Sequence, residues 1–264
     1  MRYYFLFFVL LLNPRPVRGQ FTTSLEPETV AQFEQYAAKV EQQLQRRWHS
    51  PAAFLSVDGN AQDRDAAIRG ELVIRPADPG NPVAVNGGLI HDWVATMFIP
   101  DTSSRKVLEV LEDYDAHRQI YPNITNSRLL HRDGNNVSGY WRLEWKRPLL
   151  QVVLDVEQDA HYEEIGPGKW ISRAYAKRIW EVESPGTAHE KKLPLGEGRG
   201  FLWRLYAYWS LEMSNGGVFA ECRTLSLSRS IPPGLAWAIE PFVQSLPRES
   251  LASTMRSTQK AATK

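Results

Sequence analysis

The chain has 264 residues, of which 43% are hydrophobic and 23% are charged, and its 31 basic residues stand against 30 acidic ones. This composition excludes an intrinsically disordered protein and predicts one large globular domain or two small ones. A formal net charge of +1 gives no long-range attraction for nucleic acid, so no nucleic-acid partner is expected.

The first residues have the pattern of a secretory signal peptide. Arg2 supplies a positive charge, the run from Tyr3 to Leu12 is apolar, and Val17-Arg18-Gly19 resembles a cleavage site. We therefore expect removal of residues 1–19 and export of the mature chain to the periplasm or the outside. The alternative is an uncleaved anchor; no later segment is long and apolar enough to cross a membrane, so none is expected after cleavage.

Residues 20–88 form an N-terminal segment that leads into the main domain. The stretch from Glu26 to Trp48 predicts a helix, because apolar residues recur at three- and four-residue spacing. The members of this stripe are Val30, Phe33, Ala37, Val40 and Leu44. From Ser50 to Gly88 the chain is rich in Pro, Gly, Asp and Asn, with one strand-like stretch, Gly70 to Pro76.

The segment from Gly87 to Pro100 predicts a strand that ends at the proline. A helix with Val107, Leu108 and Leu111 on its apolar face should follow, and a second short helix should run from Asp115 to Ile120. His91-Asp92 in the strand is expected to have a surface or capping role, and the Asp113 to Asp115 segment a capping role. The alternatives are a metal or base role for His91-Asp92 and a paired-carboxylate site at Asp113 to Asp115.

Residues 124–229 alternate apolar and polar positions, which predicts a long antiparallel meander with one apolar and one polar face. Turn sequences at residues 133–136, 166–168 and 214–217 predict hairpins. Residues 184–200 interrupt the pattern and predict a long loop. The strand residues predicted to face an apolar ligand are Trp141, Leu143, Leu154, Val156, Leu205, Trp209 and Leu211.

A C-terminal helix, predicted from Pro233 to Thr258, should cover the apolar face. Its stripe is Leu235, Ile239, Phe242 and Leu246, which resumes after Pro247 at Leu251 and Met255. Pro241 and Pro247 should kink the helix, which lets it follow a curved sheet.

The segments His91 to Leu130 and Cys222 to Leu251 carry a resemblance to the START-like superfamily, which includes steroidogenic lipid-transfer domains, polyketide cyclases and coenzyme Q-binding proteins. The resemblance covers about residues 89–260 and leaves residues 261–264 as a tail. It implies an α+β helix-grip fold, in which a curved antiparallel sheet wraps around a long kinked C-terminal helix, with the extra N-terminal helix added to it. It also implies a cavity for an apolar ligand and no fixed catalytic residues.

The sequence itself indicates room in this cavity. A two-residue turn at Asn215-Gly216 places the small residues Ala220 and Cys222 beside Trp209 and Leu211. Trp237 and Phe242 of the terminal helix should complete the wall. Arg178 either faces inward, where it would bind a carboxylate or an anionic ligand group, or lies exposed on the other face.

The chain lacks the short motifs of hydrolases, zinc enzymes, disulfide oxidoreductases and P-loop proteins, so no metal or cofactor is expected. Cys222 is the single cysteine, which excludes an internal disulfide and favours a buried apolar role.

The function indicated is a monomeric carrier or sensor of a lipid-like or polycyclic molecule. The alternatives are an enzyme of the cyclase or dehydratase type, and a structural protein with a filled core. The few inward polar candidates, which are Arg178, Cys222 and Thr224, favour the carrier.

Overall fold

The computed structural model describes residues 22–50, 52–147, 150–230 and 236–264, without the side chains of residues 147, 150 and 236–244. The predicted signal peptide and its cleavage site lie outside the described residues. The helices are α1 (Pro27–Trp48), η1 (Ser56–Gly59), α2 (Ala61–Ile68), α3 (Ser104–Glu112), α4 (His117–Ile120) and α5 (Ala236–Ala262). The strands are β1 (Thr23–Ser24), β2 (Val73–Pro76), β3 (Val83–Val85), β4 (Gly88–Pro100), β5 (Ile124–Asp133), β6 (Asn136–Arg147), β7 (Leu150–Gly166), β8 (Lys169–Glu183), β9 (Lys191–Lys192), β10 (Glu197–Gly198), β11 (Arg204–Ser214) and β12 (Gly217–Arg229).

A 10-stranded antiparallel sheet forms the centre of the molecule, in the order β2-β4-β12-β11-β8-β7-β6-β5, with β3 and β9 added at β4 and β8. The predicted turns join β5 to β6, β7 to β8 and β11 to β12. The expected pairing of Trp209 with Cys222 is confirmed. The sequence did not predict that β4 pairs with β12 along its whole length, which places the first long strand of the chain beside the last.

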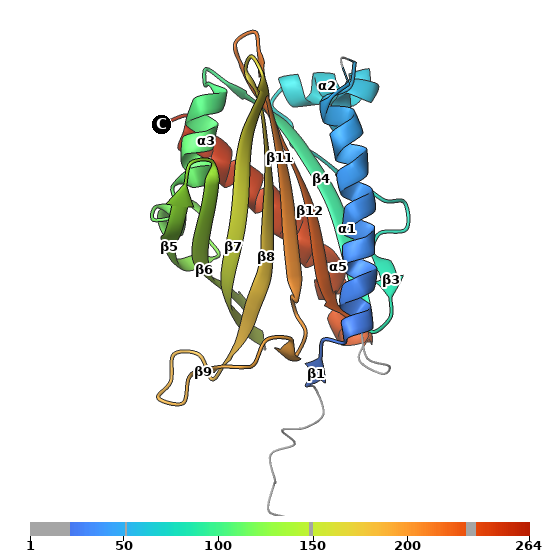
Figure 1. Cartoon of the computed structure of the whole chain (residues 1–264), viewed down its shortest axis with the longest axis vertical. Helices are drawn as coiled ribbons and strands as arrows, with labels where there is room; N and C mark the ends of the chain where they lie inside the picture. Colours follow the sequence, from blue (N-terminus) through green and yellow to red (C-terminus); the bar gives the residue numbers. More distant parts are fainter. Residues whose placement is uncertain (1–21, 51, 148–149, 231–235) are drawn as a thin grey trace, which may run out of the picture.

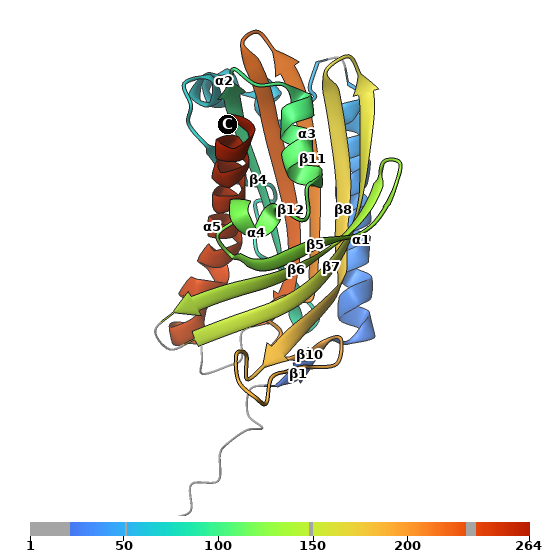
Figure 2. The same cartoon turned by 90° about the vertical axis from the view of Figure 1, so that its left-hand side faces the viewer.

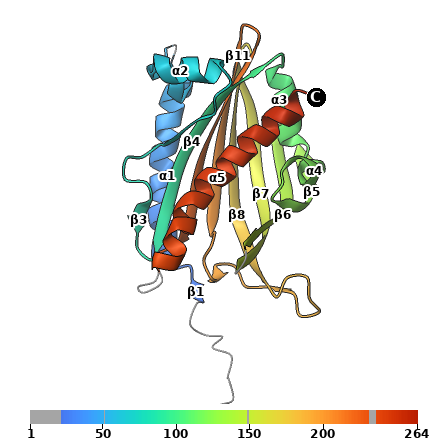
Figure 3. The same cartoon turned by 180° about the vertical axis from the view of Figure 1, so that it is seen from behind.

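α5 crosses the concave face of the sheet, and the strands curve around it (Figures 2 and 3). Among the side chains described for α5, the buried ones recur at helical spacing: Leu251, Met255, Thr258 and Ala262. Leu251 and Met255 share an apolar cluster with Val107 and Leu108 of α3. The predicted cover of the sheet is confirmed, and the architecture is an α+β helix-grip fold. The helix continues through Pro241 and Pro247, and its predicted kinks stay a prediction.

α1 packs on the opposite face of the sheet (Figure 1), where the sequence predicted a polar surface. The buried members of its predicted stripe are Phe33, Ala37, Val40 and Leu44. They belong to a cluster with Tyr206 and Tyr208 of β11 and Phe219 of β12. The expectation of one polar face is therefore wrong for these strands, because their outward positions carry aromatic residues that α1 covers.

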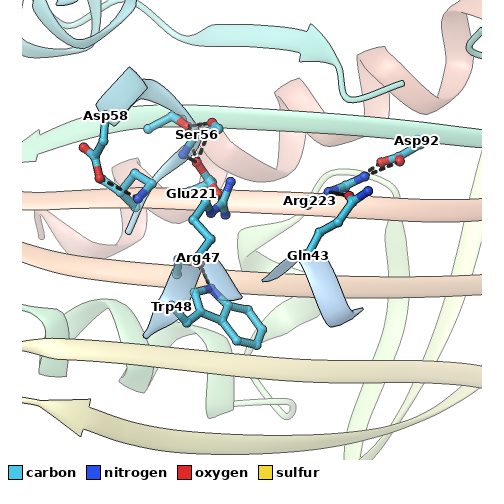
Figure 4. Close-up of polar contacts among 11 residues, drawn as sticks. Gln43, Arg47, Trp48, Ser56, Asp58, Asp92, Glu221 and Arg223 are labelled. Carbon is cyan, nitrogen blue, oxygen red and sulfur yellow. Dashed lines mark hydrogen bonds and ion pairs between the residues drawn. The ribbon is translucent and has the colours of Figure 1, made fainter. Parts of the chain in front are cut away.

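Polar and charged side chains fix α1 and η1 on this face (Figure 4). Glu221 of β12 is 1% exposed, pairs with Arg47 of α1, and accepts hydrogen bonds from the backbone nitrogen and the hydroxyl of Ser56, both at 2.6 Å. Arg223 of β12 donates two hydrogen bonds to Asp92 of β4, at 2.9 and 2.6 Å. Because a buried charge is costly without its partner, the contacts of Glu221 with Arg47 and Ser56 favour one position of α1 and η1 on the sheet.

Candidate ligand site on the concave face of the sheet

The predicted ligand residues of the strands lie on the concave face, with the exception of Arg178. They belong to two apolar clusters. The cluster that includes side chains of α3 and α5 contains Trp209, Leu211, Ala220 and Cys222. The second cluster contains Leu143, Leu154 and Val156, with Leu205 packed against it. Trp141 packs against both clusters, so the predicted residues form one continuous inner surface.

Arg178 lies on the opposite face, where 47% of its side chain is exposed and its Nε donates to Glu157 at 2.7 Å. A β-bulge causes this placement. Glu157 pairs with Arg178, whereas the next residue, Gln158, pairs with Ala176, so Lys177 is an extra residue in β8. The extra residue reverses the alternation of side chains, and Arg178 does not share the inner face of Ala176. Of the two placements left open by the sequence, the structure shows the exposed one.

The predicted room beside Trp209 is more closely packed than the sequence indicates. Ala220 and Cys222 are 0% and 1% exposed, in one cluster with Leu251 and Met255 of α5. Burial raises the pKa of the Cys222 thiol, which fits the apolar role expected for it. The side chains of Trp237 and Phe242, predicted to complete the wall, lie outside those described.

Small side chains occupy the middle of the concave face. One row of paired residues contains Ala160 of β7, Ala174 of β8, Ala207 of β11 and Thr224 of β12. In the next row, Ala176 and Ser226 lie on either side of Leu205. We call these residues the small-residue patch: Ala160, Ala174, Ala176, Ala207, Thr224 and Ser226. Since adjacent strands are about 4.8 Å apart, the first row extends about 14 Å across the sheet.

Two members of the small-residue patch, Ala207 and Thr224, are partly exposed although their strands lie inside the sheet. Close packing by a covering helix would bury both side chains. Aromatic side chains adjoin them: Trp209 is the next inward residue of β11, and Trp93 of β4 pairs with Thr224. The space over the patch is therefore accessible and has aromatic neighbours.

A polar aromatic cluster borders the patch on the side of α4. The Tyr114 ring stacks on Trp141 with ring centroids 5.6 Å apart. It lies directly over Gly139, where an added Cβ would be 1.8 Å from the ring. Gln158, which is 5% exposed and pairs with Ala176, donates through Nε2 to the Tyr114 hydroxyl at 2.8 Å.

His117 of α4 has both ring nitrogens engaged. Its Nδ1 accepts a hydrogen bond from Trp141 Nε1 at 2.9 Å, and its Nε2 donates to the Val110 carbonyl at 3.1 Å. This arrangement assigns the proton to Nε2. Burial lowers the pKa of His117 to about 4, so the ring is neutral at pH 7. His117 therefore orients Trp141, because neither of its ring nitrogens is free to take a proton or to bind a metal.

Sequence reasoning missed several inward polar residues. Gln158 continues the alternation of Leu154 and Val156, so the signal for its inward position was present in the strand pattern. Tyr114 lies in the segment predicted to form helix caps, and His117 lies in the predicted short helix from Asp115 to Ile120. Nothing in their spacing indicates that the two side chains pack over β6. The surface role expected for His91 is wrong, because His91 is 2% exposed and lies 3.2 Å from the Ser228 hydroxyl.

Among the residues that the structure describes, no group of side chains is arranged to hold a metal ion, and no helix is long and apolar enough to span a bilayer. An open groove of about 530 Å³ lies between α5 and Leu72 and Ile74. The exposed basic residues Arg248, Arg256 and Lys260 line this groove, so it differs in chemistry from the concave face.

No family model and no curated protein sequence matches the chain. Similar solved structures include a STAR-related lipid transfer protein from Xanthomonas axonopodis, at 19% identity over 74% of this chain and 99% of that chain, with a TM-score of 0.47. Human STARD10 is similar at 14% identity over 80% of this chain and 82% of that chain, with a TM-score of 0.43. The Zhui aromatase/cyclase from Streptomyces sp. R1128 is similar at 8% identity over 66% of this chain and 93% of that chain, with a TM-score of 0.41.

At these identities and scores, the fold assignment rests on the geometry of this chain itself. The meander from β5 to β12, the pairing of β12 with β4 and the position of α5 on the concave face make up a helix-grip fold. The fold expected from the sequence resemblance is thus confirmed, and it leaves the ligand undetermined.

Proposed function

We propose that the chain is an exported protein that carries or senses an apolar ligand, held between the small-residue patch and α5. The observation that supports this most directly is the partial exposure of Ala207 and Thr224 in the middle of the concave face. Alanines on three adjacent strands leave room for a flat or elongated molecule, and Trp93 and Trp209 offer aromatic surface to it.

The polar groups around the patch support binding more than catalysis. Both nitrogens of His117 are engaged, and burial raises the pKa of Tyr114 to about 12, so that its hydroxyl stays neutral. These groups orient Trp141 and Gln158, which border the patch. They favour the carrier over the cyclase or dehydratase alternative, because acid–base catalysis needs a group that changes its protonation near neutral pH.

The substitution Ala207→Trp tests this proposal, because it fills the patch and leaves the face covered by α1 unchanged. We expect the variant to fold with a nearly unchanged free energy of unfolding and to lose uptake of the fluorescent methyl ester of cis-parinaric acid. Fluorescence titration measures the uptake, and native mass spectrometry of freshly purified unaltered protein should reveal a co-purified apolar ligand.

Ala220→Trp is the matched control, since Ala220 is 0% exposed within the cluster that contains Leu251 and Met255. Overpacking there should lower the free energy of unfolding by about 1–3 kcal/mol. If Ala207→Trp destabilises the chain to the same extent, and the unaltered protein takes up no ester, the patch belongs to a filled core and the carrier proposal is wrong.

A further inference from the structure

Four polar side chains lie at the β4–β12 edge of the small-residue patch. In the pairing of these two strands, His91 lies opposite Ser226 and Trp93 lies opposite Thr224. All four positions alternate with residues that face α1, so their side chains point to the concave face. We call His91, Trp93, Thr224 and Ser226 the polar corner. From strand spacing and rise, the four positions lie within a rectangle of about 5 by 7 Å.

Two hydrogen-bonding groups of the polar corner, on Trp93 and Ser226, lack partners within the described part of the chain. The indole N–H of Trp93 is buried and unpaired. Ser226 is 8% exposed, and no described residue makes a hydrogen bond with its hydroxyl. Buried donors without acceptors are rare in proteins, and each one points to a water or ligand atom that completes it.

Among the described residues, the strand positions around the polar corner carry no charged side chain on the concave face. Across the described rows of the patch, the residues paired with one another are small, aromatic, aliphatic or neutral polar. The charged side chains of β4 and β12 point to the other face, where Arg223 pairs with Asp92 and Glu221 pairs with Arg47. Burial lowers the pKa of His91 to about 4, so this ring brings no positive charge at neutral pH.

We infer that the polar corner binds an uncharged oxygen atom of the ligand, a carbonyl or a hydroxyl, and that the site discriminates against carboxylates. This inference rests on the proposed function. A neutral oxygen accepts hydrogen bonds from Trp93 and Ser226 while the apolar part of the ligand lies over the alanines. A carboxylate loses its hydration in the same place and gains no cation in return. The ligand class is thus a neutral amphipathic molecule, such as an ester, an alcohol or a polycyclic ketone.

Titration of the full chain with cis-parinaric acid and with its methyl ester at pH 7.5 tests the effect of ligand charge on affinity. The two fluorescent probes share one hydrocarbon chain, so their shapes are nearly the same. We expect the ester to bind at least about tenfold more tightly than the acid, which corresponds to about 1.4 kcal/mol. Acid binding as tight as ester binding would overturn this inference and leave the carrier proposal intact. Failure of both probes to bind would overturn the two together.

The polar corner is tested by Trp93→Phe, with Trp203→Phe as the matched control. The indole nitrogen of Trp203 is also buried and unpaired, but this residue belongs to the cluster that α1 covers. Loss of one hydrogen bond in Trp93→Phe should weaken ester binding about threefold to tenfold, whereas Trp203→Phe should leave it within about twofold. Unchanged ester affinity in Trp93→Phe, or an equal loss in both variants, would overturn the assignment of the polar corner.

Discussion

The wall of the candidate site requires a glycine at position 139 of β6, because a side chain there would collide with Tyr114. The Tyr114 ring occupies the position that a Cβ would take, 1.8 Å from the nearest ring atom. The ring therefore packs on Gly139 and Trp141, and its hydroxyl accepts a hydrogen bond from the Gln158 amide. One glycine thereby determines how the segment between α3 and α4 packs against the sheet.

We therefore predict that Gly139→Ala displaces Tyr114 and lowers the free energy of unfolding by about 1–3 kcal/mol, as overpacking does in other cores. Urea denaturation measures the change. Gly166→Ala is the control, because no atom lies within 4 Å of the added Cβ at Gly166, and it should change the stability by less than about 0.5 kcal/mol. Equal stability of the two variants would show that Tyr114 does not need this contact.

Side-chain direction along a strand is predictable from the sequence only as far as the strand stays regular. The alternation in β7 correctly places Leu154 and Val156 inward and extends to Gln158. In β8 the same alternation fails at Arg178, because the bulge adds Lys177 and no local sequence signal marks it. The sequence allows an inward Arg178 only if β8 is regular, and the extra residue Lys177 makes it irregular.

α1 is an integral layer of the domain, held by a charge pair as well as by its apolar stripe. Glu221 is 1% exposed and pairs with Arg47, whose side chain is 18% exposed (Figure 4). The Thr96 hydroxyl donates to the same carboxylate at 3.0 Å, as do two groups of Ser56. Arg47 compensates the buried charge of Glu221, so a variant that removes Arg47 leaves a carboxylate in the sheet without its counter-charge.

Arg47→Met should therefore lower the free energy of unfolding by roughly 2–4 kcal/mol, below the usual loss for a fully buried pair because Arg47 is partly exposed. Adding Glu221→Gln, which removes the charge and keeps a hydrogen-bond acceptor, should restore part of that loss. Arg69→Met is the control for the same side-chain change: Arg69 and Glu71 are 61% and 62% exposed, so less than about 1 kcal/mol is expected. A double variant less stable than Arg47→Met alone would contradict this account.

Elements formed by neighbouring residues were predictable, whereas their long-range partners were not. The turn at Asn215-Gly216 specifies the β11–β12 register, and helical spacing identifies both α1 and the end of α5. The pairing of β12 with β4 joins strands more than a hundred residues apart, and no local pattern selects that partner. Likewise, the apolar stripe of α1 shows that the helix is covered, but not which face of the sheet covers it.

For the whole molecule, the absence of an internal disulfide means that the stability of the chain depends on its packed layers. Cys222 is buried and free, and the described helices α1 and α5 cover the two faces of one sheet. A domain of this size can bury enough apolar surface without a covalent crosslink. Folding then requires no oxidation, and the free energy of unfolding should be the same with and without dithiothreitol.

We predict that the chain expressed with residues 1–19 in a secreting bacterial host is recovered outside the cytoplasm with the mass of a chain that begins at Gln20. In a signal peptide the apolar run is the feature that a translocation system recognises. Val9→Arg, which places a charge in the run from Tyr3 to Leu12, should therefore leave the chain unprocessed and inside the cell. Intact-mass measurement distinguishes the two forms and also detects cyclisation of Gln20, which would block N-terminal sequencing. An exported chain that retains Met1 would instead indicate an uncleaved anchor. In that case α5 and the concave face would operate at a membrane surface, and ligand uptake would have to be measured from vesicles.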